Sequence, residues 1–550
     1  YNVNEGEKYT INDVDVIGEI PFEEEVYIEI VNSLRDQTYS QAQITSIEEF
    51  FVNVLGNRGY AFAEVKGDTE ITDDSNEVKL IFTVIPGNKT YTRKILFTGN
   101  DVTQDHVLRR EMRQFEGAWT SDNSIEAGKV RLERLGYFKE VNVETIPVVG
   151  TEDQIDIVYN VDEETTGSVG GNIGYSDFGL MLGFNLQEQN FLGSGNTVGI
   201  GINKNIYSEM YNLSFMNPYA TKDGVSLGYN VYFRETDYGE FNVANYLTNS
   251  NGFGAQFGYP TSDITRLGFN VTYDKTDIDV GTLPALEIYD FVSAEGNIFE
   301  TLSVQFSWQR ITLNRGLFPT AGSSTVISLS TTVPGSDLSY YRSSIRQRYY
   351  RPLSSNFVFG FSGELGYLDA YGDTEETPFF QNFYAGGPRS LRGFESNTLG
   401  PRSTDAPCYE FNYEEKTCPN LIDTDGDGEL DAPYINPYAG STSRYRDRPI
   451  GGNIKVEGSM QLIFRLPFIE DQRSLRSAFF FDFGNVFSDN CKDYQINCYK
   501  PALEDLRYSY GVGVTWITGF GPLSLAISKP TNAGPQERTE EFQFTVGNVF

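Results

Sequence analysis

The chain has 550 residues, a net charge of −34 and aromatic residues at 14% of its positions. A chain this long exceeds one ordinary globular core, so we expect two or more domains. The acidic balance argues against a nucleic-acid partner, because phosphate binding needs clustered Lys and Arg. No apolar run reaches the roughly 18 residues of a transmembrane helix, which leaves open a β-barrel, whose hydrophobicity is hidden in alternation.

The first part of the chain contains one pattern twice. Helical periodicity over "FEEEVYIEIVNSLRDQ" predicts a first helix. Ile47, Phe51 and Leu55 then lie on one face of a second predicted helix, which should end near Gly56. The strand-like "EVKLIFTVIPG" comes next. Two segments then recur in similar form: "YTINDVDVIGEI" resembles the later "YTRKILFTGND", and "LGNRGYAFAEV" resembles the later "LERLGYFKEVNVET". The sequence therefore predicts a repeat of strand, helix, helix, strand, strand over 8–88 and 89–164.

Residues 165–550 change to strict alternation, as in "FVFGFSGELGY" and "YSYGVGVTW". One face is large and aromatic, while the other is mostly Gly and Ser. A soluble barrel would instead show Lys and Glu outside a packed core. An apolar outer face with Tyr or Trp near strand ends is typical of a membrane barrel with a polar lumen. This length predicts about 16 antiparallel strands of roughly 10 residues each.

The two strands that must meet to close this barrel predict a weak seam. The first, "GSVGGNIGYSD", is rich in Gly, which weakens a strand and loosens its register. The last, "EEFQFTVGNVF", ends in an aromatic residue. An opened seam offers an edge to another strand, although the glycines could simply relieve crowding inside the barrel. The residues assigned to the seam are Gly170, Gly171, Gly174, Phe542, Phe544, Gly547 and Phe550.

Four cysteines form two close pairs, Cys408 with Cys418 and Cys491 with Cys498. Polar surroundings suggest two loop disulfides in an oxidising compartment. Metal-binding or free thiols are the alternative, but the only histidine, His106, is distant in sequence.

The stretch "DTDGDGELD" resembles a calcium loop with an acidic turn as the alternative. Asp423, Asp425 and Asp427 occupy positions 1, 3 and 5, and Asp431 occupies position 9, but Tyr434 stands where a bidentate acid belongs. No catalytic set or phosphate loop is present, so we expect no enzyme and no required cofactor, with calcium at most structural.

Two repeats with "RLERLGYF", then a barrel, then "GGPRSLRGF" together resemble the Omp85 superfamily. The resemblance implies POTRA domains at 8–88 and 89–164, a 16-stranded barrel at 165–550, and a sixth extracellular loop at about 384–450. Members usually carry five POTRA domains. Residues 1–7 are therefore expected to end a preceding domain, and these two domains would be the fourth and fifth.

The resemblance also assigns site residues. Arg392, Gly393 and Phe394 would tip the sixth loop inside the lumen, where an arginine needs partners because an unpaired buried charge is costly. Asp482 matches the family's acid, whereas Gln461 stands where many members have a glutamate. The motif could also be only a staple without a mechanistic role.

Within the family, "LRREMRQFEGAW" (108–119), "DGVSLGY" and "LFPTAG" resemble members that assemble outer-membrane barrels. Glu111 would then meet an arginine of a partner lipoprotein; alternatively, it is one more charge on an exposed helix. The implied function is to fold and insert β-barrel proteins into the bacterial outer membrane through the seam, with the POTRA domains in the periplasm.

The implied partners are the lipid bilayer, unfolded barrel clients, periplasmic chaperones and lipoproteins of the assembly machine. A two-partner-type polypeptide secretion pore is the alternative within the superfamily. A passive diffusion porin would lack the POTRA repeats and the lumen loop.

Overall fold

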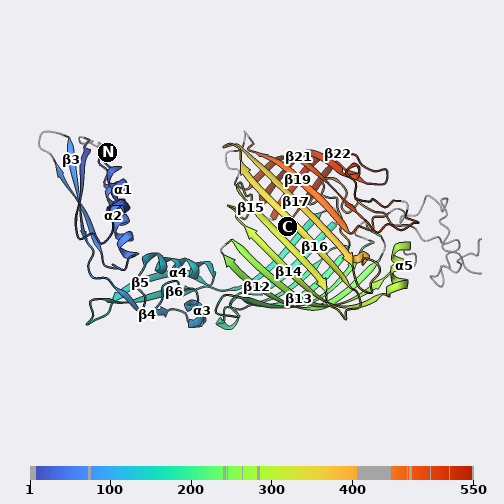
Figure 1. Cartoon of the computed structure of the whole chain (residues 1–550), viewed down its shortest axis with the longest axis horizontal. Helices are drawn as coiled ribbons and strands as arrows, with labels where there is room; N and C mark the ends of the chain where they lie inside the picture. The colour runs from blue at the N-terminus through green and yellow to red at the C-terminus, as the bar shows by residue number, and fades with distance from the viewer. Residues whose placement is uncertain are drawn as a thin grey trace, which may run out of the picture. The chain divides into compact units, whose positions relative to one another are not determined.

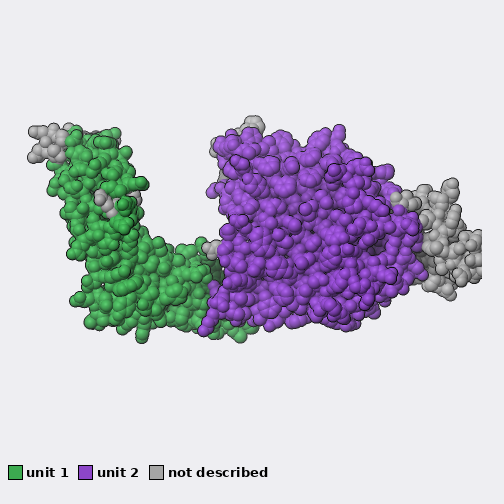
Figure 2. All heavy atoms as spheres, viewed as in Figure 1, with its two compact units in different colours: residues 1–167, 189–195 green, residues 168–188, 196–550 purple. Residues whose placement is uncertain are grey.

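The chain forms two compact units, residues 1–167 with 189–195, and residues 168–188 with 196–550 (Figure 2). The computed structural model describes 8–71, 76–176, 179–239, 243–244, 246–262, 264–280, 285–404, 448–466, 469, 473–495, 497–519 and 521–547. Within these ranges, no helix is both long and apolar enough to cross a membrane.

The first unit contains two α+β repeats in which helices pack against a three-stranded sheet (Figure 1). In each sheet the last strand of the repeat is central, parallel to the first strand and antiparallel to the second, giving the orders β1-β3-β2 and β4-β6-β5. This confirms the predicted repeat. The elements are β1 Thr10–Gly18, η1 Glu24–Val26, α1 Ile28–Asn32, α2 Gln41–Gly56, β2 Glu64–Ile71, β3 Glu77–Ile85, β4 Tyr91–Thr98, α3 Asp105–Arg109, α4 Asp122–Arg134, β5 Phe138–Pro147 and β6 Gln154–Glu163.

The apolar faces of these helices form the two cores. In α2, Ile47, Phe51 and Leu55 are buried as their spacing predicts, and the helix ends at Gly56. The helix predicted over residues 22–37 is shorter than expected: it is a 3-10 turn followed by the five residues of α1. A left-handed residue, Asp36 with a φ of 65°, turns the chain just beyond it.

Sixteen of the described strands close into a barrel in which each strand pairs antiparallel with its neighbours (Figure 1), as the alternation predicts. They are β7 Gly167–Ser176, β8 Gly179–Glu188, β9 Thr197–Lys204, β10 Ser208–Asn217, β11 Ser226–Asp237, β12 Leu247–Ser262, β13 Thr265–Asp279, β14 Ile298–Ile311, β15 Gly322–Thr332, β16 Tyr340–Pro352, β17 Phe357–Ala370, β19 Ile454–Phe464, β20 Leu475–Phe487, β21 Arg507–Thr518, β22 Gly521–Thr531 and β24 Phe542–Val546. The two-residue strands β18, Gly393–Phe394, and β23, Thr539–Glu540, pair with each other in a small sheet that is separate from the barrel sheet.

The two faces of the wall differ as the sequence predicts. Large side chains such as Leu365 and Trp516 are at least half exposed on the outer face. Small residues on the inner face make room for the lumen loop. A Cβ on Gly366 would lie 2.6 Å from the Phe383 ring of that loop, so a larger side chain would displace it.

A separate apolar cluster sits among the loops at one end of the barrel. Its buried members include Tyr246, Ile288, Phe291 and Phe379, and the cluster draws on several separate loop and strand-end segments. The helix α5, Leu286–Glu295, supplies two of them. This cluster gives the long loops a core of their own.

Candidate functional site

Arg392, directly before β18, forms a two-point ion pair with Asp482 of β20. The guanidinium Nε and Nη2 each donate to a carboxylate oxygen at 2.7 Å, and the Arg392 backbone amide donates to the same carboxylate at 3.2 Å. The Asp482 side chain is fully buried and that of Arg392 is only 16% exposed. Losing either partner would leave a charge buried and unpaired, so this geometry fixes the loop motif in the lumen.

Two further residues that sequence reasoning missed complete the Arg392 site. Nη2 also donates to Ser459 Oγ at 3.0 Å, and the guanidinium carbon lies 3.5 Å from the centre of the Phe480 ring. Phe480 is buried between the exposed side chains of Phe479 and Phe481. The alternation within "FFFDF" therefore carried the signal that Phe480 faces the lumen with Asp482.

Gln461 reaches this site only indirectly in the described structure. Its Nε2 donates to Ser459 Oγ at 3.3 Å, and Ser459 in turn accepts from Arg392. The two lie on the same face of β19 because they are two residues apart. Asp482 is thus the charged partner of Arg392, and Gln461 helps to orient the neutral hydroxyl of Ser459.

A polar cavity of about 550 Å³ lies beside the loop motif and is lined by charged side chains. Arg346 donates to Glu364 at 2.9 Å, and Lys455 lies 3.2 Å from carboxylate oxygens of both Glu364 and Glu457. Ser390 of the loop donates to Glu457 at 2.6 Å. This network spans the adjacent strands β16, β17 and β19 and gives the loop a second attachment to the wall.

The seam between β7 and β24 closes the barrel. Among the described residues, Val546 pairs with Tyr175 across it, and β24 pairs with β22 along all five of its residues on the other side. Gly547 has a φ of 92°, and a Cβ there would lie 2.7 Å from the Cα of Gly174. The contact therefore requires glycine.

The other residues predicted at the seam differ in what surrounds them. Gly170 faces β8, since a Cβ there would meet the Asn185 side chain at 2.4 Å, whereas a Cβ on Gly171 would lie 4.0 Å from the Gly183 carbonyl oxygen, an ordinary van der Waals distance. Phe542 and Phe544 are exposed on the outer face of β24. Phe550 lies outside the described residues.

Glu111 lies in the turn after α3 and is buried, with its side chain only 4% exposed. Arg131 donates to its carboxylate at 2.6 Å and to its backbone carbonyl at 3.1 Å. Arg110 lies 3.7 Å away on the other side of the carboxylate. The alternative of a charge on an exposed helix does not describe this position.

The turn 189–195 is held by the second repeat, a feature that sequence reasoning missed. Asn190 donates to Thr103 Oγ1 at 2.8 Å, and Tyr137 donates to the Gln189 carbonyl at 3.1 Å. Glu163 holds the segment that contains Thr103 by accepting hydrogen bonds from the backbone amides of Val102 and Thr103. Burial acts to raise the pKa of Glu163, but these hydrogen bonds hold that pKa below its ordinary value.

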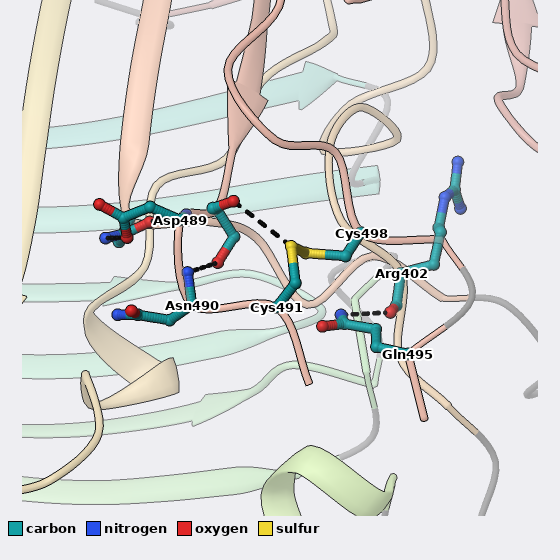
Figure 3. The surroundings of a disulfide bond; sticks show 8 residues. Arg402, Asp489, Asn490, Cys491, Gln495 and Cys498 are labelled. Atoms are coloured by element: carbon teal, nitrogen blue, oxygen red, sulfur yellow. Dashed lines mark hydrogen bonds between the residues drawn. A yellow bond between two sulfur atoms is a disulfide. The ribbon is translucent and has the colours of Figure 1, made fainter. Parts of the chain in front are cut away.

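Cys491 and Cys498 form the predicted disulfide (Figure 3). The loop that they close is bonded to the sixth loop at Arg402, because Gln495 donates to the Arg402 carbonyl at 2.9 Å and the Arg402 amide donates to the Asn497 carbonyl at 2.9 Å. The predicted Cys408–Cys418 disulfide and the calcium ligands Asp423, Asp425, Asp427 and Asp431 lie outside the described residues.

Comparison with known proteins gives consistent matches. The Omp85 superfamily domain matches residues 190–550, and the POTRA model, described as a surface antigen variable number repeat, matches 9–87 and 90–164. The outer membrane protein assembly factor BamA of Neisseria meningitidis serogroup B is 29% identical over 100% of this chain and 68% of that protein. That of Buchnera aphidicola is 28% identical over 55% of this chain and 51% of its own length.

The crystal structure of BamA from Haemophilus ducreyi lacking POTRA domains 1–3 superposes with a TM-score of 0.79 at 32% identity. The match covers 98% of this chain and 99% of that one. This chain spans about half to two thirds of the length of the curated relatives cited.

Proposed function

Because this chain belongs to the Omp85 superfamily, we propose that it folds and inserts β-barrel proteins into the bacterial outer membrane, with its POTRA domains in the periplasm. The relatives named as outer membrane protein assembly factors support this function. The reaction breaks no covalent bond, so it requires no catalytic side chain and no cofactor. Calcium, if it binds at 423–431, would order an extracellular loop.

The observation that carries the proposal is the seam itself: among the described residues, Tyr175 pairs with Val546 and Gly547 approaches Gly174 closely beside them. Separating β7 from β24 there exposes two strand edges. A backbone group left unpaired in lipid is costly, so an exposed edge favours pairing with an incoming strand. Backbone pairing is shared by all clients, which makes the seam tolerant of their sequence.

The POTRA sheets offer a first binding surface for unfolded clients. β2 and β5 are edge strands, each paired on one side only within the described sheets. An extended segment can add to such an edge through main-chain hydrogen bonds. We propose that clients released by periplasmic chaperones dock there before they reach the seam.

We further propose that a BamD-like lipoprotein binds the second POTRA domain around Glu111. The Glu111 carboxylate is buried beneath Arg131, whose side chain is 29% exposed. A partner arginine that binds Glu111 would compete with Arg131 for its carboxylate. The ion pair therefore predicts that partner binding rearranges this cluster.

The proposal is tested by reconstituting the chain in liposomes, with partner lipoproteins and the complete POTRA array, and adding an unfolded barrel protein. Folding should be faster than in empty liposomes. A disulfide between Tyr175→Cys and Val546→Cys should abolish the acceleration, and reduction should restore it. A matched disulfide between Leu525→Cys and Phe544→Cys joins β22 to β24 and should leave the rate unchanged.

No acceleration with the full partner set would contradict the proposal. If an unfolded polypeptide instead crossed into the liposome lumen, the result would favour the secretion pore of the same superfamily.

A further inference from the structure

The tip of the lumen loop is bonded to the last barrel strand as well as to the β20 wall. Gln543 of β24 donates from Nε2 to the Phe394 carbonyl at 2.8 Å and accepts from the Gly393 amide at its Oε1 at 3.3 Å. Its side chain is only 2% exposed. One carboxamide thus satisfies a backbone donor and a backbone acceptor of the loop motif, much as a neighbouring strand would.

The segment leading into β24 continues this attachment. Gly393 and Phe394 of β18 pair with Glu540 and Thr539 of β23. The Glu395 amide donates to the Arg538 carbonyl at 3.0 Å.

Two more bonds lie further along the loop. The Arg538 amide donates to Thr398 Oγ1 at 3.0 Å, and Arg402 Nη2 donates to the Gln536 carbonyl at 2.9 Å. Residues 536–543 are therefore bonded along their length to residues 393–402.

The same strand also meets β7 at the seam, where Val546 pairs with Tyr175, so the loop motif and the seam share β24. We propose that Gln543 is a positioning residue that couples the loop motif to the last strand, so that seam opening and release of the loop tip from the lumen favour each other. The use of this coupling in client insertion rests on the proposed function. The coupling itself does not.

The physical basis is linkage. Moving β24 away from its closed position strips Gly393 and Phe394 of buried hydrogen-bond partners, and an unmet buried backbone group is unfavourable. Freeing the motif equally removes the partners of Gln543. Any coupling between two such equilibria acts in both directions with the same magnitude.

The first test measures release of the loop in the full chain held in lipid nanodiscs without clients. A Ser390→Cys reporter, which removes the Ser390 bond to Glu457 equally in every variant compared, is labelled with a water-soluble maleimide. Gln543→Met is the test variant, because Met fills the same space without either hydrogen bond. Losing two buried hydrogen bonds corresponds to roughly a tenfold faster labelling rate. The matched control is Gln305→Met, since Gln305 of β14 bonds Asn270 on the neighbouring strand at 3.0 Å.

The second test measures the seam in a chain with Tyr175→Cys and Val546→Cys. The Gln543→Met variant should slow disulfide formation between these cysteines by a similar factor, while Gln305→Met leaves it unchanged. Gel mobility before and after heating shows that each variant retains the folded barrel.

Unchanged labelling and unchanged crosslinking in a folded Gln543→Met barrel would overturn the proposal. Faster labelling with an unaltered seam would also overturn it, because the residue would then be only a loop staple. Neither readout involves a client, so failure here is distinguishable from a failure of client folding.

Discussion

At the scale of single residues, the lumen site depends on the difference between a charged and a neutral partner. Asp482 and Ser459 both accept from the Arg392 guanidinium, but only Asp482 balances its charge. Asp482→Asn keeps the shape and leaves the arginine unpaired, which should cost about 3 kcal/mol of barrel stability. Ser459→Ala should cost about 1 kcal/mol. Urea unfolding in lipid measures both, and equal losses would contradict the charge argument.

A second residue prediction concerns acid stability of the first unit. The Ile95 backbone amide, joined by Arg109, holds the pKa of Glu116 below its ordinary value. A lowered folded pKa contributes stability above the unfolded pKa of about 4.3, and this stability disappears as pH falls through the folded value. Glu116→Gln should therefore weaken the unit at pH 7 and have little effect near pH 2. The same denaturation series on Glu144→Gln, which removes an exposed carboxylate of β5, is the matched control for the loss of one charge.

At the scale of elements, the seam glycines are not equivalent. Gly547→Ala places a Cβ against Gly174 at a left-handed backbone position, so it should strain the closed seam. Gly171→Ala would place its Cβ at an ordinary 4.0 Å from the Gly183 carbonyl oxygen and should be neutral or slightly stabilising. Crosslinking between cysteines at positions 175 and 546 should slow severalfold in the first variant only. Equal rates in both would show that close approach at 547 does not control the seam.

The disulfide loop is a second element whose effect should be local. Closing so short a loop removes chain entropy worth about 2 kcal/mol. Reduction should therefore raise amide hydrogen exchange in residues 488–499 and around Arg402, which this loop contacts. Exchange in β20 and β21 away from the loop is the internal control. If protection at Arg402 survives reduction, its bonds hold without the disulfide.

At the scale of the whole molecule, the two units have separate cores. The buried clusters of the first unit draw only on residues 11–161, and those of the second on residues 243–486. Independent cores predict independent unfolding. Urea titration of the full chain in lipid should show the helical signal of the first unit lost before the barrel signal. One coincident transition by both probes would contradict this.

Local pattern in the sequence was enough to predict the element types. Alternation over "FVFGFSGELGY" and helical spacing at Ile47, Phe51 and Leu55 each report which side of an element is apolar, and that property does not depend on distant residues. Arg392 with Asp482, Gly174 with Gly547 and Cys491 with Cys498 also meet as expected.

Tertiary structure decided what lies opposite each side chain. Nothing in "EEFQFTV" indicates that Gln543 bonds the tip of a loop some 150 positions earlier, and nothing in "RREMRQ" indicates that Glu111 is buried under Arg131. These contacts depend on how a closed barrel and a packed repeat bring distant segments together. Periodicity fixes the face on which a side chain lies, whereas closure of the fold determines its partner.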